Sequence, residues 1–408
     1  MQYGLIGEKL GHSYSKEIHE KIGRYGYELK EIPRDNLASF FQKKDFKGIN
    51  VTIPYKEECM PYLDYIDDSA LKIGAVNTVV NKDGKLSGYN TDYYGLKSLI
   101  EHSGYSLSGK KVLILGTGGT SKTAWAVCKD LGASCIYKVS RKESEETITY
   151  EAATSVHKDA DFIVNTTPSG MYPNIDAQPI DLSYFTKLEA LFDAVYNPSR
   201  TKLMLQAESL KIGSFGGLWM LVCQAIVACE FFTGKPVDKD IIDTIFKEVK
   251  GNHENIVLIG MPSVGKTTIG KILSKKTGKK FFDTDDLIVA REGRSIPDIF
   301  STDGEAYFRK VESEVIKETS SLSNCVIATG GGAILNPKNV EVLKAFGKIF
   351  LLQRPLESLK PTDDRPLSKD MDKLKKLYEE RMPIYKAAAD VEIDACGGID
   401  ATIEQIIK

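Results

Sequence analysis

A stretch near residue 260 has the residue types and the spacing of a phosphate-binding loop. It reads Gly260-Met-Pro-Ser263-Val264-Gly265-Lys266-Thr267-Thr268 and fits the pattern G-x-x-x-x-G-K-[ST]. An apolar run precedes it and a helical pattern follows it, so the expected context is strand, loop and helix. Backbone N–H groups of such a loop surround phosphates, the lysine neutralises their oxygens, and the Thr267 hydroxyl can ligate Mg²⁺. A glycine-rich turn with a chance Lys-Thr pair is the alternative, and the flanking pattern disfavours it.

A second pair of residues could move a proton. Lys56 follows a β-rich run that Pro54 stops, which places it at a strand end, where open α/β sheets bind their ligands. Asp92 lies in Gly88-Tyr-Asn-Thr-Asp92, which leads into an expected helix. An ammonium beside a carboxylate suits the proton transfer of an alcohol–ketone interconversion. Sequence spacing does not show that the two side chains meet, so their pairing is a hypothesis.

Residues 111–139 have the pattern of a dinucleotide-binding βαβ unit. A strand at 111–115 runs into Gly116-Thr117-Gly118-Gly119-Thr120, and a helix to Leu131 and a strand at 135–139 follow. The loop departs from the usual G-x-G-x-x-G. The second strand ends at Ser140-Arg141-Lys142, with no acid to hold a ribose 2′-hydroxyl. Arg141 and Lys142 suit a 2′-phosphate, which predicts NADP(H), although three glutamates at 143, 145 and 146 argue against this and are expected to face solvent.

The composition is that of a globular protein with more than one core. The chain has 408 residues, 42% of them hydrophobic and 27% charged, which suggests two or three domains. A formal net charge of −2 gives no electrostatic reason to expect nucleic acid as a partner. We find no apolar run long enough for a bilayer and no signal segment. The seven cysteines have no C-x-x-C spacing, so we expect reduced thiols and a cytoplasmic protein.

Seven motifs in order make residues 1–250 resemble shikimate dehydrogenase. They are Gly11-His-Ser13-x-Ser15, Asn50-Val-Thr52-Ile-Pro-x-Lys56, Gly74-Ala-Val-Asn77-Thr, Asn90-Thr-Asp92-x-x-Gly95, Gly116-x-Gly-Gly, Asp193-x-Val-Tyr196-x-Pro and Gly217-Leu-x-Met-Leu-Val-x-Gln224-Ala. The resemblance implies that Lys56 transfers the proton with Asp92 beside it and that Gly217 lies near the nicotinamide. It implies substrate contacts from Ser13, Ser15, Thr52, Asn77, Asp92, Tyr196 and Gln224.

Downstream of the phosphate-binding loop, the chain resembles shikimate kinase over about 254–408. The motifs are Asp283-Thr-Asp285, a helix start with Arg309, Gly330-Gly331-Gly332, Asp363-Asp-Arg365-Pro-Leu367 and Arg381-Met-Pro. The resemblance implies that Asp285 orients the attacking hydroxyl, that Lys266 and Arg365 stabilise the transferred phosphoryl group, and that Thr267 and Asp283 serve Mg²⁺. Arg309, Gly331 and Arg381 would contact shikimate, and Ser263, Val264, Gly265 and Thr268 the nucleotide. Neither Arg354 nor Lys360 can be assigned to the adenine.

These patterns together predict an α/β protein with three parts. An N-terminal α/β substrate subdomain (1–92 and 218–250) encloses a Rossmann-type NADP subdomain (93–217). After a linker at 251–255, a P-loop NMP-kinase-like parallel α/β domain occupies 256–408. A phosphate-binding loop normally lies close to the start of its own domain, which supports a boundary just before it.

The expected function is a bifunctional enzyme that acts on small molecules. The first module would reduce 3-dehydroshikimate to shikimate with NADPH, and the second would convert shikimate to shikimate 3-phosphate with ATP and Mg²⁺. One alternative is a front half that prefers quinate or NAD. The other is a non-catalytic sensor of shikimate that regulates a partner, against which the intact lysine–carboxylate sets speak. The sequence leaves the oligomeric state open.

Overall fold

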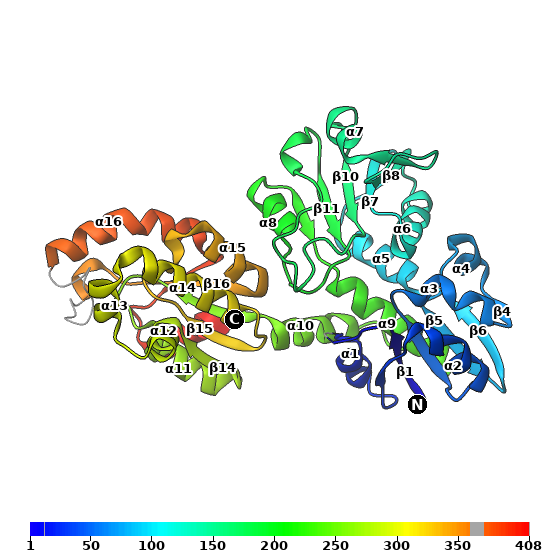
Figure 1. Ribbon diagram of the computed structural model, residues 1–408, viewed down its shortest axis with the longest axis horizontal. Helices are drawn as coiled ribbons and strands as arrows, with labels where there is room; N and C mark the ends of the chain where they lie inside the picture. The colour runs from blue at the N-terminus through cyan, green and yellow to red at the C-terminus, as the bar shows by residue number, and fades with distance from the viewer. Residues whose placement is uncertain (12, 360–370, 408) are drawn as a thin grey trace. The chain divides into compact units, whose positions relative to one another are not determined.

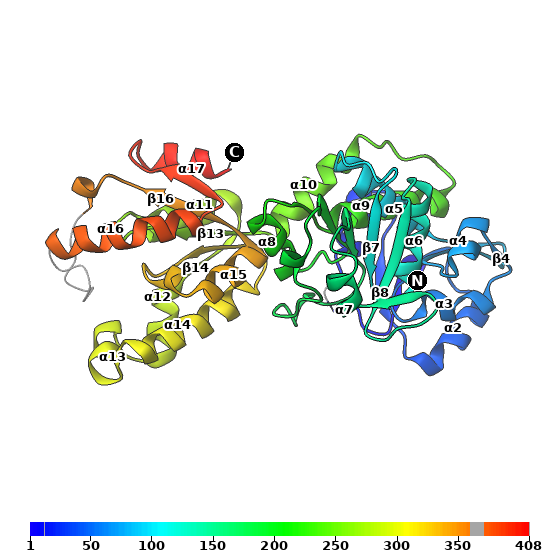
Figure 2. The same cartoon turned by 90° about the horizontal axis from the view of Figure 1, so that it is seen from above.

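The computed structural model describes residues 1–11, 13–359 and 371–407 (Figure 1). Its internal contacts divide the chain into two compact units, Met1–Lys250 and Gly251–Lys408. Each unit is an α/β fold, and Figure 2 shows the same elements from above. Among the described helices, none is both long and apolar enough to cross a membrane.

The first sheet of unit 1 is mixed and has the strand order β2-β1-β3-β5-β6-β4. Strands β1 and β3 are parallel, and β5 and β6 form an antiparallel hairpin. The hairpin turns at Asp83 and Gly84, whose φ angles of 53° and 82° are those of an Asp-Gly turn that matches the strand twist. The strands are β1 (Tyr3–Gly7), β2 (Glu28–Glu31), β3 (Gly48–Val51), β4 (Tyr65–Ile66), β5 (Thr78–Lys82) and β6 (Lys85–Tyr89).

The second sheet of unit 1 is parallel throughout, in the order β12-β11-β10-β7-β8-β9. Its strands are β7 (Lys111–Leu115), β8 (Cys135–Ser140), β9 (Thr147–Thr149), β10 (Phe162–Asn165), β11 (Ala190–Asp193) and β12 (Gly213–Phe215). Alternate residues of β7 point to opposite faces: Val112 and Ile114 pack against one group of helices, and Leu113 and Leu115 against another. Both faces are therefore covered, which explains the nearly continuous apolar runs.

Helix α9 (Leu218–Thr233) is apolar on every side and is shared by the two sheets. Met220 and Cys223 belong to the core of the second sheet, Ala228 and Phe232 to that of the first, and Ile226 to a cluster with α1 and α10. The helices of unit 1 are α1 (Ser15–Ile22), α2 (Leu37–Lys43), α3 (Tyr55–Glu58), α4 (Asp68–Ile73), α5 (Thr91–His102), α6 (Gly119–Asp130), α7 (Tyr150–Ser155), α8 (Lys202–Ser209), α9 and α10 (Ile241–His253).

Unit 2 contains one parallel sheet with the order β14-β15-β13-β16-β17. Its strands are β13 (Asn255–Ile259), β14 (Lys280–Asp283), β15 (Cys325–Ala328), β16 (Gly347–Gln353) and β17 (Val391–Asp394). The described helices are α11 (Lys266–Thr277), α12 (Thr284–Glu292), α13 (Ile296–Thr302), α14 (Gly304–Ser320), α15 (Pro337–Phe346), α16 (Met371–Ala388) and α17 (Ile399–Ile407). Strand β13 lies at the centre, so the loop after it opens at the carboxyl edge of the sheet.

One local expectation differs from the structure. The residues expected as a linker, 251–255, are mostly regular: α10 continues to His253, and β13 begins at Asn255. The polar stretch Gly-Asn-His is compatible with a last helical turn, because helix ends tolerate residues that a helix interior disfavours.

The buried His19 of α1 gives unit 1 an acid-sensitive stability. Its ring is fully buried, stacks on Tyr27 with the centroids 4.0 Å apart, and its Nδ1 lies 2.9 Å from the Tyr25 hydroxyl. Burial lowers the pKa of His19 from 6.5 to about 3. Below pH 6.5 the His19 side chain is therefore protonated in the unfolded chain but stays neutral in the folded protein. The free energy of unfolding falls as the pH falls from about 6.5 towards 3.

We expect His19→Gln to weaken this pH dependence. Between pH 7 and 5.5 the natural protein should lose about 1 kcal/mol more unfolding free energy than the variant, given a slope of up to about 1.4 kcal/mol per pH unit for one proton. Urea unfolding followed by tryptophan fluorescence measures this, because Trp125 and Trp219 both lie in unit 1. Equal losses in both proteins would contradict the assignment.

Candidate active sites

Unit 1 contains a cavity of about 530 Å³ that residues from both sheets line. Predicted site residues from far-apart parts of the sequence meet there, at the loops that follow the strands. Those that line it are Ser13, Ser15, Thr52, Lys56, Asn77, Asp92, Thr120, Tyr196, Gly217 and Gln224. The structure therefore gathers ten of the residues that the sequence proposed into one pocket.

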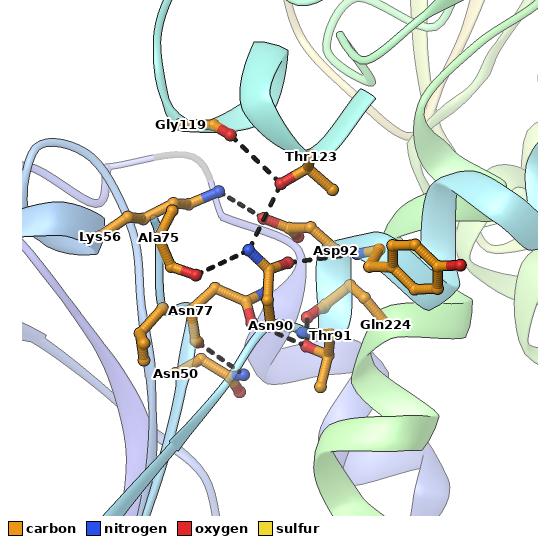
Figure 3. Close-up of polar contacts among 12 residues, drawn as sticks. Asn50, Lys56, Ala75, Asn77, Asn90, Thr91, Asp92, Gly119, Thr123 and Gln224 are labelled. Atoms are coloured by element: carbon orange, nitrogen blue, oxygen red, sulfur yellow. Dashed lines mark hydrogen bonds and ion pairs between the residues drawn. The ribbon is translucent and has the colours of Figure 1, made fainter. Parts of the chain in front are cut away.

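Lys56 and Asp92 form an ion pair in this cavity, with 2.5 Å between Nζ and Oδ2 (Figure 3). Their side chains are 16% and 11% exposed. Lys56 lies in α3, which the fully buried Tyr55 anchors, and Asp92 lies in the first turn of α5. The α5 N-cap is Asn90, whose Oδ1 accepts a bond from the Tyr93 N–H at 3.2 Å. In this poorly solvated place the two charges interact more strongly than they would in water.

A buried polar network fixes the amides beside the ion pair. Asn77 Oδ1 accepts a bond from the Thr91 N–H at 2.7 Å, and the Thr91 hydroxyl lies 3.2 Å from Gln224 Oε1. Asn50 accepts from the Tyr27 hydroxyl at 2.6 Å. The sequence motifs contain Thr91 and Asn50, but no role in the site was predicted for either residue. For Thr91 the reason is that a threonine at a helix start is normally interpreted as a helix cap. Here Thr91 holds Asn77 and Gln224 in place.

The lining of the cavity also contains Tyr196 and Gly217. The Tyr196 ring centroid lies 5.0 Å from that of Tyr14. Burial raises the pKa of Tyr196, although a hydrogen bond with Ser13 lowers it. The phenol therefore stays protonated and can donate a hydrogen bond. Gly217 approaches the backbone so closely that a Cβ there would lie 2.2 Å from Ala194 O. This close approach explains why only glycine fits.

The glycine loop between β7 and α6 leaves room for a ligand. Gly116 has φ +109°, which favours glycine, and a Cβ on Gly118 would meet nothing within 4 Å. Thr117 is exposed and Gly119 begins α6. The N-terminus of a helix beside an open glycine loop suits the pyrophosphate of a dinucleotide.

At the end of β8 the predicted 2′-phosphate site is accessible. Arg141 and Lys142 are exposed, and the Lys142 N–H lies 3.3 Å from Ser140 Oγ. The glutamates at 143, 145 and 146 are exposed, as expected, and Glu146 pairs with Lys138 at 3.3 Å.

In unit 2 the phosphate-binding loop has the backbone that a nest of N–H groups requires. Gly260, Ser263 and Gly265 have positive φ angles of 143°, 64° and 104°. Lys266 Nζ donates to the carbonyls of Gly260 and Met261 at 2.8 and 3.1 Å, so it lies across the loop. The loop also contains the buried Val264, and Thr268 lies in the first turn of α11.

Two oxygen groups that suit a magnesium ion lie beside this loop. The Thr267 hydroxyl donates to Asp283 Oδ2 at 2.7 Å, which brings the two predicted Mg²⁺ residues together. Hydroxyl and carboxylate oxygens are the donors that this ion prefers. The residues thus fit the metal that the sequence implied.

A charged cluster surrounds Gly330–Gly332 on the β14–β15 side of the loop. Arg309 Nη1 lies 2.8 Å from Glu312 Oε2, and Arg381 Nη1 donates to Gly331 O at 2.9 Å. Asp285 lies so near that a Cβ on Gly330 would be 2.5 Å from its Oδ1. Burial raises the pKa of Glu312 although Arg309 opposes this. The cluster presents two guanidinium groups and a carboxylate, a set that suits a hydroxylated acid.

Some residues near this site were missed or lie outside the described part. Glu312 follows Arg309 by one helical turn and carried no separate signal in the sequence. Arg354, left unassigned, donates through Nε to Ala395 O at 3.0 Å, and its Nη2 lies about 4.0 Å from where a Cβ on Gly265 would be. It is therefore next to the phosphate-binding loop. Arg365, the segment Asp363–Leu367 and Lys360 lie outside the described residues.

Comparison with known families matches both units. Residues 5–79 match the family profile "Shikimate dehydrogenase substrate binding domain", and residues 262–408 match the profile "Shikimate kinase". A curated relative from Clostridium beijerinckii, a shikimate dehydrogenase (NADP(+)), is 38% identical over 261 residues, which span 60% of this chain and 96% of the relative.

Solved structures give the same result for the first unit. Shikimate dehydrogenase 1 from Peptoclostridium difficile has a TM-score of 0.58 and 37% identity, with 61% of this chain and 98% of that chain covered. A shikimate 5-dehydrogenase from Thermus thermophilus, solved in complex with NADP(H) and shikimate, has a TM-score of 0.55 and 27% identity, with coverages of 61% and 99%.

The fold and the two sites define a class of protein: a dinucleotide-dependent α/β oxidoreductase joined to a P-loop phosphotransferase. Within that class, the chain belongs to the shikimate dehydrogenase family and carries a shikimate kinase domain at its C-terminus. The resemblances inferred from the motifs and the predicted fold class are confirmed.

Gly217 in the cavity wall and Gly118 in the glycine loop should respond differently to an added methyl group. Gly217→Ala should destabilise unit 1 by at least about 2 kcal/mol, because the Cβ would strike a backbone carbonyl that cannot move aside. Gly118→Ala, the matched control with open space around it, should cost less than about 1 kcal/mol. Urea unfolding followed by tryptophan fluorescence compares them, and equal costs would show that the approach to Ala194 is not tight.

Proposed function

We propose that the two units catalyse successive steps on one ring acid. Unit 1 reduces 3-dehydroshikimate to shikimate with NADPH, and unit 2 phosphorylates the 3-hydroxyl of shikimate with ATP and Mg²⁺. The observation that carries the proposal is the Lys56–Asp92 ion pair, which lies in a cavity next to an open dinucleotide loop. The comparisons support it by placing this chain among NADP-dependent shikimate dehydrogenases.

In unit 1 the protein handles the proton and the orientation of the substrate. NADPH, held at the glycine loop, would supply the hydride for the carbonyl carbon. Lys56 gives a proton to the carbonyl oxygen as that oxygen gains charge, and Asp92 orients the ammonium. Ser13 and Ser15 bind the carboxylate of the substrate, while Thr52, Asn77 and Gln224 bind its hydroxyls. Tyr196 donates a hydrogen bond to the substrate.

The glycine loop and the end of β8 hold NADP(H). Gly116 to Thr120 accommodate the pyrophosphate at the start of α6, and Ser140, Arg141 and Lys142 bind the 2′-phosphate. Gly217 leaves room beside the nicotinamide. The exposure of Arg141 and Lys142, with Glu146 directed to Lys138 instead, supports NADP over NAD.

In unit 2 the residues for the nucleotide and the residues for shikimate lie at different strand ends along the carboxyl edge of the sheet. Lys266 leaves the loop carbonyls to meet the phosphates, and Thr267 and Asp283 hold Mg²⁺. Asp285 orients the attacking hydroxyl, and Arg309 and Arg381 grip the carboxylate of shikimate with the backbone of Gly331. Arg365, outside the described residues, completes the site as a phosphoryl-stabilising cation.

The proposal also includes the location of the enzyme in the cell and its partners. All seven cysteines are unpaired with one another, which supports the reducing cytoplasm. The near-neutral net charge supports small-molecule substrates as the partners, without nucleic acid or membrane.

We expect Lys56→Ala and Lys266→Ala to separate the two activities. Lys56→Ala should lower the reduction rate at least about 100-fold because the carbonyl oxygen loses its acid. Lys266→Ala should lower phosphorylation by a similar factor because transition-state charge is no longer neutralised. Each variant should keep the other activity within about twofold, since the sites lie in separate units.

The measurement follows NADPH absorbance with 3-dehydroshikimate and ADP release with shikimate on the purified full chain. Quinate in place of shikimate, tested in the oxidation direction, reports on substrate preference. A natural protein that binds shikimate but turns over neither substrate would refute the proposal and leave the sensor alternative.

A further inference from the structure

A buried hydrogen-bonded chain connects the dinucleotide loop to the helix that carries Asp92. Thr123 lies in the second turn of α6, and its hydroxyl donates to Gly119 O at 3.2 Å and accepts from Asn90 Nδ2 at 3.3 Å (Figure 3). Asn90 and Thr123 are each only 1% exposed. The motifs and their implied roles left both residues without a function.

The direction of these bonds follows from the donors and acceptors present. Asn90 Oδ1 accepts from the Tyr93 N–H, so its Nδ2 must point the other way, towards Ala75 O at 2.9 Å and Thr123 Oγ1. The Thr123 oxygen is then an acceptor, and its single hydrogen goes to Gly119 O. The polar side-chain atoms of Asn90 and Thr123 all have hydrogen-bond partners. This fixes the orientation of the Asn90 amide.

Asn90 connects the two backbone segments that carry the ion pair. As the N-cap of α5 it sets the start of the helix two residues before Asp92. Its bond to Ala75 holds the segment whose next residue, Val76, donates to Lys56 O at 2.8 Å. Thr123 adds a third anchor from the dinucleotide-binding helix. A shift of Asn90 would therefore move Lys56 and Asp92 relative to the glycine loop.

Other contacts cross the same boundary but supply less orientation. The Tyr93 hydroxyl bonds to the exposed Asp130 at the far end of α6. Lys122 Nζ and Glu57 Oε2 lie 3.0 Å apart, with side chains 35% and 50% exposed, and such solvated pairs contribute little. A Cβ on Gly119 would lie 3.5 Å from Ala75 Cβ and 3.8 Å from Lys56 Cβ, which is ordinary packing without direction. Losing the Thr123 hydroxyl, in contrast, would leave an Asn90 N–H buried without a partner, which is costly.

We propose that Thr123 is a positioning residue of the reductase. Acting through Asn90, its hydroxyl aligns the Lys56–Asp92 pair with the dinucleotide held at the glycine loop. It touches neither substrate nor dinucleotide. This inference rests on the reductase activity proposed above for unit 1.

The test compares two pairs of side chains at position 123, threonine with valine and serine with alanine. Within each pair, only one member has the hydroxyl. Thr123→Val keeps the shape of the natural side chain without its hydroxyl, and Thr123→Ser and Thr123→Ala differ from each other by the hydroxyl alone. We expect kcat for the reduction to fall about tenfold in the valine and alanine variants, because a small displacement of the reacting groups has an effect of about this size. In the serine variant kcat should stay within about threefold. KM for 3-dehydroshikimate should change less than about twofold.

Further readouts separate positioning from a general structural effect. The isotope effect on kcat with NADPH deuterated at the transferred position should increase, because a misaligned hydride step becomes more rate-limiting. The Kd of NADP⁺ from calorimetry should stay within about twofold in Thr123→Val. Kinase activity on the same chain calibrates the active concentration, and Glu57→Gln, which removes only the exposed pair, should keep kcat within about twofold.

Three results would overturn the proposal. The first is a Thr123→Val protein, folded by its melting curve, that keeps kcat within twofold. The second is a serine variant as slow as the alanine variant, which would show that the methyl group and not the hydroxyl matters, and this comparison stands if the valine variant does not fold. The third is a tenfold weaker Kd for NADP⁺ with unchanged kcat. A natural protein without reductase activity would instead refute the proposed function itself.

Discussion

The pairing of one ammonium with one carboxylate, shielded from most solvent, is the constraint on which unit 1 depends. Lys56 and Asp92 are 36 residues apart and lie on different helices, so the pair exists only if α3 and α5 are held at a fixed separation. Removing either partner would leave the other charge poorly solvated and uncompensated, which is costly. The surrounding buried amides are all hydrogen-bonded, and such satisfied networks keep a single arrangement.

Unit 2 also brings together groups that are far apart in the sequence, but it does so at one edge of a parallel sheet. The parallel sheet brings the ends of β13, β14 and β15 to one edge, and each end delivers a different group: the phosphate-binding loop, Asp283 with Asp285, and the three glycines. The small residues at 330–332 let Asp285 and Arg309 approach the backbone, since a Cβ on Gly332 would lie 2.3 Å from Arg309 Nη1. The phosphate side and the acid-binding side are thereby kept apart on neighbouring strands.

Residues with a strong local signal were predictable from the sequence, and residues that act through tertiary contacts were not. The loop at 260–268 and the glycine loop at 116–120 were found because strand, loop and helix are contiguous in the chain. The pairing of Lys56 and Asp92 was a hypothesis from the sequence, and only the fold brings the two side chains together. Thr91, Thr123 and Glu312 were missed because a threonine near a helix start or a glutamate within a helix resembles a cap or a solvated side chain. The linker was misjudged because polar residues and one glycine do not by themselves end a helix.

Helix α9 has a further consequence for how the protein is made. Its apolar surface completes the cores of both sheets of unit 1, yet it is synthesised after all twelve strands of that unit. Until residue 233 has left the ribosome, one face of each sheet lacks part of its cover and exposes apolar surface. The clusters on the other faces contain no residue of α9 and can form earlier. The remaining faces must wait for this one late segment, so unit 1 is expected to complete its native packing close to the end of its own translation.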